Sequence, residues 1–198
     1  TLPTISAACG TYTGLTLAGD KAANYSLTNN AVKGTGTITQ KTLNASFEAI
    51  SKVYDGTTNA AAPTPTLTGV VDGDNVSVTA SGSYDSKNAG SRTVNYTLNL
   101  SGTDAANYSL SGTTTGAGTI TLRPVILTAE ATEIIRGEAI PELTGSASNM
   151  VAGEPAPTWS TTADSSSRSG QYPIIGALDS SIAGNYEVTQ ASGNAIAL

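Results

Sequence analysis

The chain has 198 residues, with 9 basic and 15 acidic side chains and a formal net charge of −6. It contains no histidine and one cysteine, Cys9, which excludes a Ser-His-Asp triad, histidine metal ligands, an intrachain disulfide and a cysteine-rich zinc site. The negative charge argues against nucleic acid as a partner, and no apolar run approaches the roughly 18 residues of a membrane span. We therefore expect neither an enzyme nor a cofactor.

Short runs of alternating hydrophobic and polar residues predict half-buried β-strands. In chain order, strands are expected at or near residues 76–78, 94–100, 119–125, 127–131 and 172–178. Residues 22–25 and their later equivalents are too short for an α-helix, and they predict one 3₁₀ turn or a tight corner, with the tyrosine packed inward. Another short helical turn is expected at residues 69–73. The predicted fold class is mainly β, with at most one short helical turn in each unit.

The sequence repeats itself, which indicates tandem modules. Residues 19–27 recur at 102–110 and more weakly at 182–188, while 65–69 recur at 141–145 and 71–74 at 151–154. We accordingly expect three units: residues 1–42, the back half of a preceding repeat; residues 43–123, the middle repeat; and residues 124–198, the last repeat. The junctions lack Gly/Ser linkers and pass from strand to strand, which favours an elongated string of modules.

Five segments of the middle repeat carry a family resemblance: residues 52–58, 71–74, 87–90, 105–108 and 118–121. They resemble the YDG repeat of large secreted bacterial surface proteins, including filamentous-haemagglutinin-like adhesins exported by two-partner secretion. The last repeat has seven residues at the positions typical of an MBG-type module: Gly137, Pro141, Leu143, Gly170, Tyr172, Asn185 and Tyr186. It resembles that module, although Arg136 stands where an aromatic residue usually precedes Gly137. The resemblance implies extracellular, β-grasp-like modules without catalysis; Ig-like sandwiches are the alternative topology.

Most of the recurring residues are expected to be structural, because repeats tend to retain structural residues at fixed positions. Asp and Gly favour turns, and a buried tyrosine normally finds a hydrogen-bond partner. The predicted structural residues are Tyr54, Asp55, Gly56, Asn24, Tyr25, Asn107, Tyr108, Asn185 and Tyr186. For the Asn-Tyr pairs, a sugar-stacking ladder is the functional alternative, and for Tyr54, Asp55 and Gly56 it is an exposed ligand contact.

Asp72, Asp74 and Asn75 offer oxygen ligands of the kind that Ca²⁺ prefers. Three groups on one turn fall short of the roughly six to eight oxygens that a calcium site needs, so no metal is expected unless Asp85 or Asp104 lies beside them. An isopeptide crosslink from Lys52, or from Lys87 with Asn88, would need a desolvated, neutral amine, whereas solvated lysines are far more common.

Trp159 and Arg168 are the candidate ligand contacts; Arg168 lies in the polar loop 164–170, and for Trp159 a place in the core is the favoured alternative. Cys9 is unpaired, and together with an open edge in residues 1–42 it predicts either disorder there or a contact between chains, by strand pairing or a disulfide. The chain is otherwise expected to be a monomer whose partners are neighbouring repeats of one long chain.

Two functions follow from these observations. The first is a structural stalk of a bacterial surface adhesin, which projects a binding region for attachment or biofilm formation. The second is direct binding of host or matrix glycans or proteins by the modules themselves.

Overall fold

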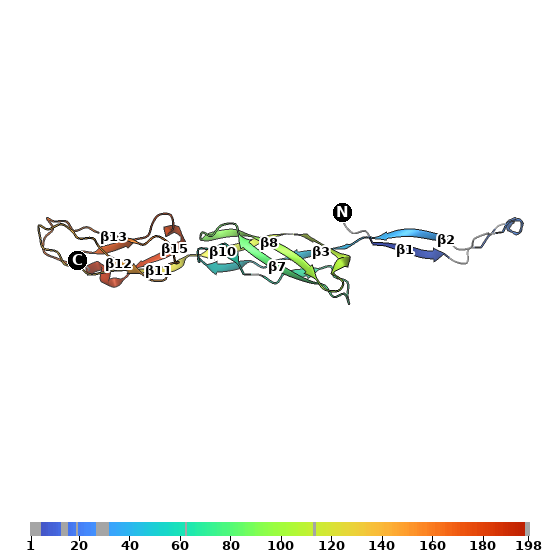
Figure 1. Ribbon diagram of the computed structural model, residues 1–198, viewed down its shortest axis with the longest axis horizontal. Helices are drawn as coiled ribbons and strands as arrows, with labels where there is room; N and C mark the ends of the chain where they lie inside the picture. The colour runs from blue at the N-terminus through green and yellow to red at the C-terminus, as the bar shows by residue number, and fades with distance from the viewer. Residues whose placement is uncertain are drawn as a thin grey trace. The chain divides into compact units, whose positions relative to one another are not determined.

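The computed structural model describes residues 5–12, 16–18, 20–26, 32–61, 63–112 and 114–196 (Figure 1). Of residues 5–12 and 32–36 only the backbone is described. Strands dominate the described part, and its helices are four 3₁₀ turns of three to five residues. The predicted fold class, mainly β in small tandem modules, is confirmed. No helix in the described ranges has the length and apolar character needed to cross a membrane.

The elements follow one another as short strands separated by turns. The strands up to residue 101 are β1 (Ile5–Tyr12), β2 (Val32–Ile38), β3 (Lys41–Ser46), β4 (Ile50–Val53), β5 (Asn59–Ala60), β6 (Thr66–Thr68), β7 (Ser77–Tyr84) and β8 (Gly90–Ser101). The later strands are β9 (Tyr108–Gly112), β10 (Thr115–Thr121), β11 (Arg123–Ala129), β12 (Gly145–Ala147), β13 (Thr158–Thr161), β14 (Ile174–Ala177) and β15 (Tyr186–Gln190). The 3₁₀ turns are η1 (Ala22–Asn24), η2 (Ala105–Asn107), η3 (Ala183–Asn185) and η4 (Ser192–Ile196).

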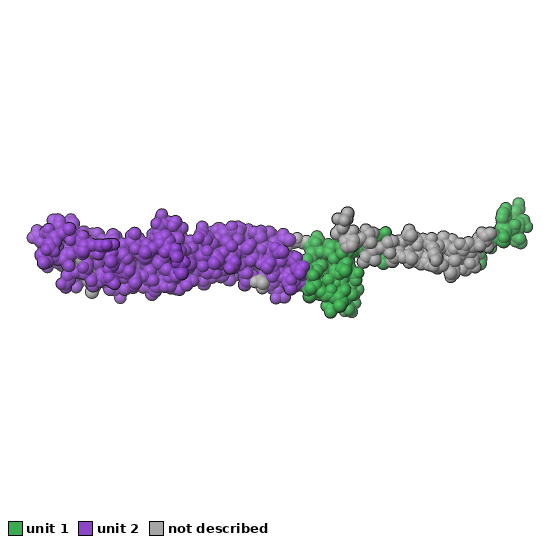
Figure 2. Space-filling view, viewed as in Figure 1, with its two compact units in different colours: residues 1–45, 67–77, 100–112 green, residues 46–66, 78–99, 113–198 purple. Residues whose placement is uncertain are grey.

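The structure divides into two compact units, coloured separately in Figure 2. Unit 1 comprises residues 1–45, 67–77 and 100–112. In this unit β1 pairs with β2 as an antiparallel hairpin, and β3 lies between β6 and β9, parallel to β9. Cys9 lies in β1, but its side chain is outside the described residues. The predicted contact between chains through residues 1–42 stays a prediction.

Unit 2 comprises residues 46–66, 78–99 and 113–198. It contains a five-stranded sheet in the order β4-β10-β8-β7-β5, a three-stranded sheet in the order β12-β11-β15, and the antiparallel pair β13-β14. Alternation decides which side chains are buried: Val94 and Tyr96 of β8 are 0% and 5% exposed, while their neighbours in the strand face solvent.

The middle and last repeats contain the same three-stranded sheet. In each of them the first strand is central and pairs in parallel with the strand that begins at the tyrosine of the Asn-Tyr pair. The register is also the same, because Lys41 lies opposite Tyr108 in one sheet and Arg123 opposite Tyr186 in the other. Equivalent positions of the two repeats can therefore be compared residue by residue.

One hydrophobic core runs across the boundary between the middle and last repeats, within unit 2. Its buried members come from both repeats: Tyr54, Tyr84, Val94, Tyr96 and Ile120 from the middle repeat, and Val125, Leu127, Ile182 and Tyr186 from the last. Because buried apolar area stabilises folding by roughly 25 cal/mol per Å², a shared core couples the two repeats energetically.

The structure confirms several local predictions and corrects others. The three Asn-containing segments form 3₁₀ turns, η1, η2 and η3. The last repeat also contains η4, so the expectation of at most one short helical turn in each unit is wrong there. Residues 69–73 do not form a helical turn: a hydrogen-bonded turn from Val71 O to Asp74 N lies there instead. The strand predicted at 119–125 is two strands, interrupted at Leu122.

Tyr25 is a further correction. It is 72% exposed rather than packed inward, whereas its equivalents Tyr108 and Tyr186 are each 4% exposed. The segment 71–74, whose groups bind the Tyr108 hydroxyl, has no counterpart ahead of Tyr25 in this sequence.

Candidate functional site

Tyr54, Asp55 and Gly56 form a turn directly after β4. The Asp55 carboxylate accepts hydrogen bonds from Thr57 N and Thr57 Oγ1, both at 2.9 Å, and Gly56 has a φ of +76°. This φ favours glycine, and a Cβ at Gly56 would lie 3.0 Å from Val151 Cγ1 of the last repeat. The turn therefore combines a left-handed backbone with a close approach by the next repeat.

Lys52 fixes the same turn. Its ammonium donates to Asp55 Oδ1 at 2.8 Å and to the carbonyls of Thr57 and Asn59 at 2.8 and 2.9 Å, and it lies 5.3 Å from the centroid of the Tyr84 ring. The pKa of Asp55 is lowered: partial desolvation raises it, but the hydrogen bonds from Lys52 and Thr57 outweigh that effect. Lys52 is thus a paired cation, and its described contacts include no asparagine side chain of the kind that an isopeptide bond would need.

The centre of the contact between the two repeats is the carboxylate of Glu154. The Tyr54 hydroxyl of the middle repeat donates to Glu154 Oε1 at 2.5 Å, and the Tyr186 hydroxyl of the last repeat donates to Glu154 Oε2. The Tyr186 oxygen also accepts from Val151 N at 2.9 Å. The two tyrosine rings meet edge to face, with centroids 5.5 Å apart and an interplanar angle of 77°. One carboxylate is therefore shared by hydroxyls from two repeats.

Both tyrosines favour their protonated form at this place. Tyr54 is 0% exposed and Tyr186 is 4% exposed. Burial and then the hydrogen bond to Glu154 raise the pKa of Tyr54 well above its ordinary value, and the same two causes raise the pKa of Tyr186. The hydroxyls consequently remain hydrogen-bond donors across the physiological pH range.

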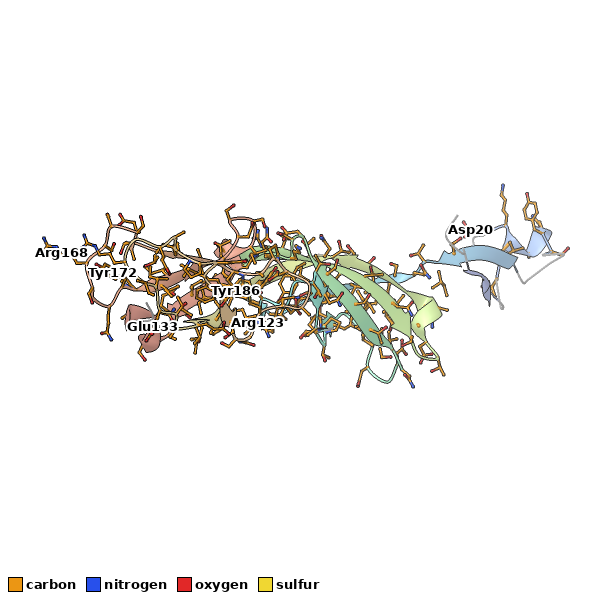
Figure 3. The ribbon with its side chains drawn as sticks, turned by 60° about the vertical axis from the view of Figure 1, so that its left-hand side comes forward. Asp20, Arg123, Glu133, Arg168, Tyr172 and Tyr186 are labelled. Atoms are coloured by element: carbon orange, nitrogen blue, oxygen red, sulfur yellow. The ribbon has the colours of Figure 1, made fainter. Side chains whose placement is uncertain are left out.

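Arg123 makes a second set of contacts between the repeats. Its guanidinium donates from Nε to Asn149 O at 2.6 Å, from Nη2 to Asn149 Oδ1 at 2.7 Å and from Nη1 to Tyr54 O at 3.2 Å. Asn149 Nδ2 in turn donates to Pro124 O at 2.9 Å. Arg123 and Tyr186, labelled in Figure 3, lie opposite each other on β11 and β15. One side chain therefore joins the end of β4 to a loop of the last repeat.

Asn185 supplies a third contact. It is 4% exposed, and its Oδ1 accepts a hydrogen bond from Ala89 N of the middle repeat at 2.8 Å. Its Nδ2 also lies 3.4 Å from Asn88 Oδ1. We call this whole contact, formed by Tyr54, Ala89, Arg123, Asn149, Glu154, Asn185 and Tyr186, the junction.

The candidate calcium ligands lie elsewhere, in unit 1. Asp74 accepts a hydrogen bond from the Tyr108 hydroxyl, and Asp104 Oδ2 accepts from Asn75 N at 2.8 Å. Asp72 is exposed on the turn that runs from Val71 to Asp74. Within the described part of the chain, no group of three or more histidine, cysteine, aspartate and glutamate side chains is placed to hold a metal. The described oxygens of Asp74 and Asp104 serve the fold.

Comparison with known families matches both repeats. The model of the YDG domain matches residues 39–116, and the model of the MBG domain (YGX type) matches residues 125–195. The chain contains a YDG domain followed by an MBG domain. It has no significant match among curated proteins or solved structures. From here on, the middle repeat is called the YDG domain and the last repeat the MBG domain.

Trp159, a candidate ligand contact, packs within the MBG domain. It is partly buried against the core, and a Cβ at Gly145 or Gly176 would lie 2.3 Å or 2.7 Å from its ring atoms. The two glycines leave the space that the indole fills. Gly145 lies in β12 and Gly176 in β14, so the ring contacts strands of two sheets.

Arg168, the other candidate ligand contact, is exposed beside a hollow of the MBG domain. Figure 3 labels Glu133, Arg168 and Tyr172, and these residues line the hollow together with Arg136 and Asp164. The Tyr172 hydroxyl donates to Arg168 O at 2.9 Å. This hydrogen bond joins the polar loop 164–170 to the segment that leads into β14. Arg136, directly before Gly137, lies beside the polar side chains that line this hollow.

Sequence reasoning did not single out Glu154, Arg123 or Asn149 as site residues. A signal for Glu154 was nevertheless available, because the segments 71–74 and 151–154 align and end in Asp74 and Glu154. In the structure the two segments have the same geometry. Gly73 and Gly153 have φ values of +92° and +85°, and each precedes a carboxylate that accepts a hydrogen bond from a tyrosine hydroxyl.

Proposed function

We propose that this chain is a structural segment of a large secreted bacterial adhesin, in which YDG and MBG domains are joined by rigid junctions and act as a spacer. In this proposal the protein lies outside the cell, and the spacer projects a binding region used for attachment or biofilm formation. The family names support β-rich repeat modules. The stalk role goes beyond them and depends on the junction.

The observation that carries the proposal is the sharing of Glu154 by Tyr54 and Tyr186. A flexible tether between domains needs few contacts, whereas this boundary has a continuous core, a shared carboxylate and the Arg123 contacts. Removing one partner of a buried hydrogen bond leaves the other unsatisfied, so bending at the boundary is costly. Such a boundary suits a spacer that holds its two domains in a fixed arrangement, and it does not suit a flexible hinge.

The test is the relative motion of the two domains in solution. Residual dipolar couplings measured on the whole chain should fit one alignment tensor for residues 46–61, 78–99 and 125–195. In the variant Arg123→Ala/Glu154→Ala, the two domains should require separate tensors while each retains its own fold. Separate tensors in the unaltered chain would refute the rigid spacer.

A second candidate function is ligand binding by the MBG domain. The observation that favours it is the hollow of the MBG domain, which is lined by two guanidinium groups, two carboxylates and a phenol, those of Arg136, Arg168, Glu133, Asp164 and Tyr172. Guanidinium and carboxylate groups bind glycan hydroxyls through charge-assisted hydrogen bonds. Saturable binding to a glycan array that Arg168→Ala abolishes would support this function, and equal binding by the variant would contradict it.

A further inference from the structure

The YDG domain contains the same hydrogen-bonded group of a tyrosine, a carboxylate and a valine amide that the MBG domain contributes to the junction. The Tyr108 hydroxyl donates to Asp74 Oδ2, and its oxygen accepts from Val71 N at 3.0 Å. In the MBG domain, Tyr186, Glu154 and Val151 make the same set of hydrogen bonds. Lys41 occupies the position of Arg123, opposite the tyrosine in the parallel pair of strands.

The left-handed residue of the junction is also repeated. Asn149, which Arg123 holds, has a φ of +61°, and the equivalent residue of the YDG domain, Gly69, has a φ of +100°. Both residues lie two positions ahead of the valine whose amide donates to the tyrosine oxygen. The backbone that receives the preceding domain at the junction is therefore present in both domains.

The two copies differ in what covers them. Asn185 is 4% exposed because Ala89 of the preceding domain lies against it, whereas the equivalent Asn107 is exposed. Val151 approaches Gly56 of the preceding domain, whereas the equivalent Val71 is 47% exposed. Among the described residues, Asp74 accepts from Tyr108 alone, whereas Glu154 accepts from two tyrosines.

We propose that the surface formed by Val71, Asp74, Asn107 and Tyr108 is the docking surface for the Tyr-Asp-Gly end of a preceding YDG domain. The incoming tyrosine donates to Asp74 as Tyr54 donates to Glu154, and a backbone N–H equivalent to that of Ala89 donates to Asn107. The occupant is a YDG domain because residues 1–42 resemble the back half of one, and because this chain already shows such an end seated on the equivalent MBG surface.

This inference rests on the proposed function, and the experiment separates the two. A lengthened chain is made in which residues 41–122 occur twice in tandem ahead of residue 123, so that one copy precedes another. Hydrogen–deuterium exchange is followed for the peptide spanning residues 70–76, which both copies release. The second copy should be covered, so this peptide should give two isotopic populations of equal size, one exchanging at least tenfold more slowly than in the unaltered chain.

Two variants assign the slow population. Asp74→Asn in the second copy, or Tyr54→Phe in the first, should return it to the fast rate. Asp72→Asn is the matched control, because Asp72 is exposed on the same turn and should leave both populations unchanged.

A single fast population in the lengthened chain would overturn the docking surface. The amide of Ala89, which donates to Asn185 across the junction, distinguishes the reasons for such a failure. If it stays protected and loses protection in Glu154→Ala, the proposed rigid junction stands and only the docking inference fails. If it exchanges freely in the unaltered chain, the proposed function fails as well.

Discussion

Arg123 holds Asn149 in a left-handed backbone conformation. Two nitrogen atoms of the guanidinium bind the backbone and side-chain oxygens of Asn149 at 2.6 and 2.7 Å, and Asn149 has a φ of +61°. A residue other than glycine or asparagine is strained at such a φ. The loop that carries Glu154 therefore begins at a backbone position stabilised from the neighbouring strand.

The first prediction concerns this pair. Arg123→Ala should lower the free energy of unfolding by about 1–2 kcal/mol, because charge-assisted hydrogen bonds are lost. Asn149→Ala should cost about 1–2 kcal/mol more than Asn149→Gly, because alanine is strained in the left-handed backbone conformation and glycine is not. Urea unfolding followed by Trp159 fluorescence measures both. Arg168→Ala is the control for loss of a surface arginine, and equal effects of the two arginine variants would contradict the prediction.

The second prediction concerns the shared carboxylate. Tyr54→Phe and Tyr186→Phe each remove one donor to Glu154, and each should destabilise the chain. Each tyrosine variant is combined separately with Glu154→Ala in a double-mutant cycle. Each cycle should give a coupling energy of about 1 kcal/mol between that tyrosine and Glu154. Tyr172→Phe, whose hydroxyl binds Arg168 O instead, should show no coupling with Glu154→Ala. Strict additivity for Tyr54 would refute a bond that spans the two domains.

The third prediction is a loss of stability at alkaline pH. Burial and the hydrogen bond to Glu154 raise the pKa of Tyr54 and Tyr186 above the unfolded value of about 10. Below pH 10 both states hold the proton, so the stabilisation is complete. As the pH rises above 10, the unfolded state releases protons that the folded state retains, so unfolding becomes easier by up to about 1.4 kcal/mol per pH unit for each tyrosine.

Unfolding midpoints between pH 8 and pH 11.5 test this dependence. The double variant Tyr54→Phe/Tyr186→Phe should show a shallower decline than the unaltered chain. Because burial also raises the pKa of Tyr84 and Tyr96, part of the decline should remain. Stability independent of pH over this range is the contrary result.

The fourth prediction concerns the Tyr-Asp-Gly turn at low pH. The hydrogen bonds of Lys52 and Thr57 outweigh desolvation and lower the pKa of Asp55. The stabilisation from Asp55 is therefore present above its unfolded pKa of about 3.9 and is lost as the pH falls through the lower, folded value. Asp55→Asn should flatten the acid side of the stability profile between pH 4 and pH 2. Asp72→Asn, on an exposed turn, should not.

The fifth prediction concerns the packing of Trp159. At Gly145 a Cβ would lie 2.3 Å from the indole ring and 2.5 Å from Thr128 O, so Gly145→Ala should destabilise the MBG domain by about 1–3 kcal/mol. Gly193→Ala, where a Cβ meets nothing within 4 Å, is the matched control. Trp159 fluorescence reports both, since this is the only tryptophan of the chain. An unchanged midpoint for Gly145→Ala would show that the indole can move aside.

Local pattern predicted the fold better than it predicted the junction. Alternation placed the strand that contains Val94 and Tyr96, and the recurring Asn-Tyr pairs placed the 3₁₀ turns. Contacts between repeats, such as Tyr54 with Glu154, join residues a hundred positions apart, and no periodicity encodes which side chains meet at that range. Tyr25 shows the same limit, because its exposure depends on partners outside its own motif.

The shared carboxylate also bears on the order in which the chain folds. A chain grows from its N-terminus, so Tyr54 and the sheet behind it are made about a hundred residues before Glu154. The YDG domain then offers a finished edge, with the Tyr54 hydroxyl and the Ala89 amide already in place, against which the MBG domain assembles. At this junction the YDG domain thus supplies the surface on which the MBG domain completes its own packing, so synthesis makes the two partners of the contact in the order in which they are needed.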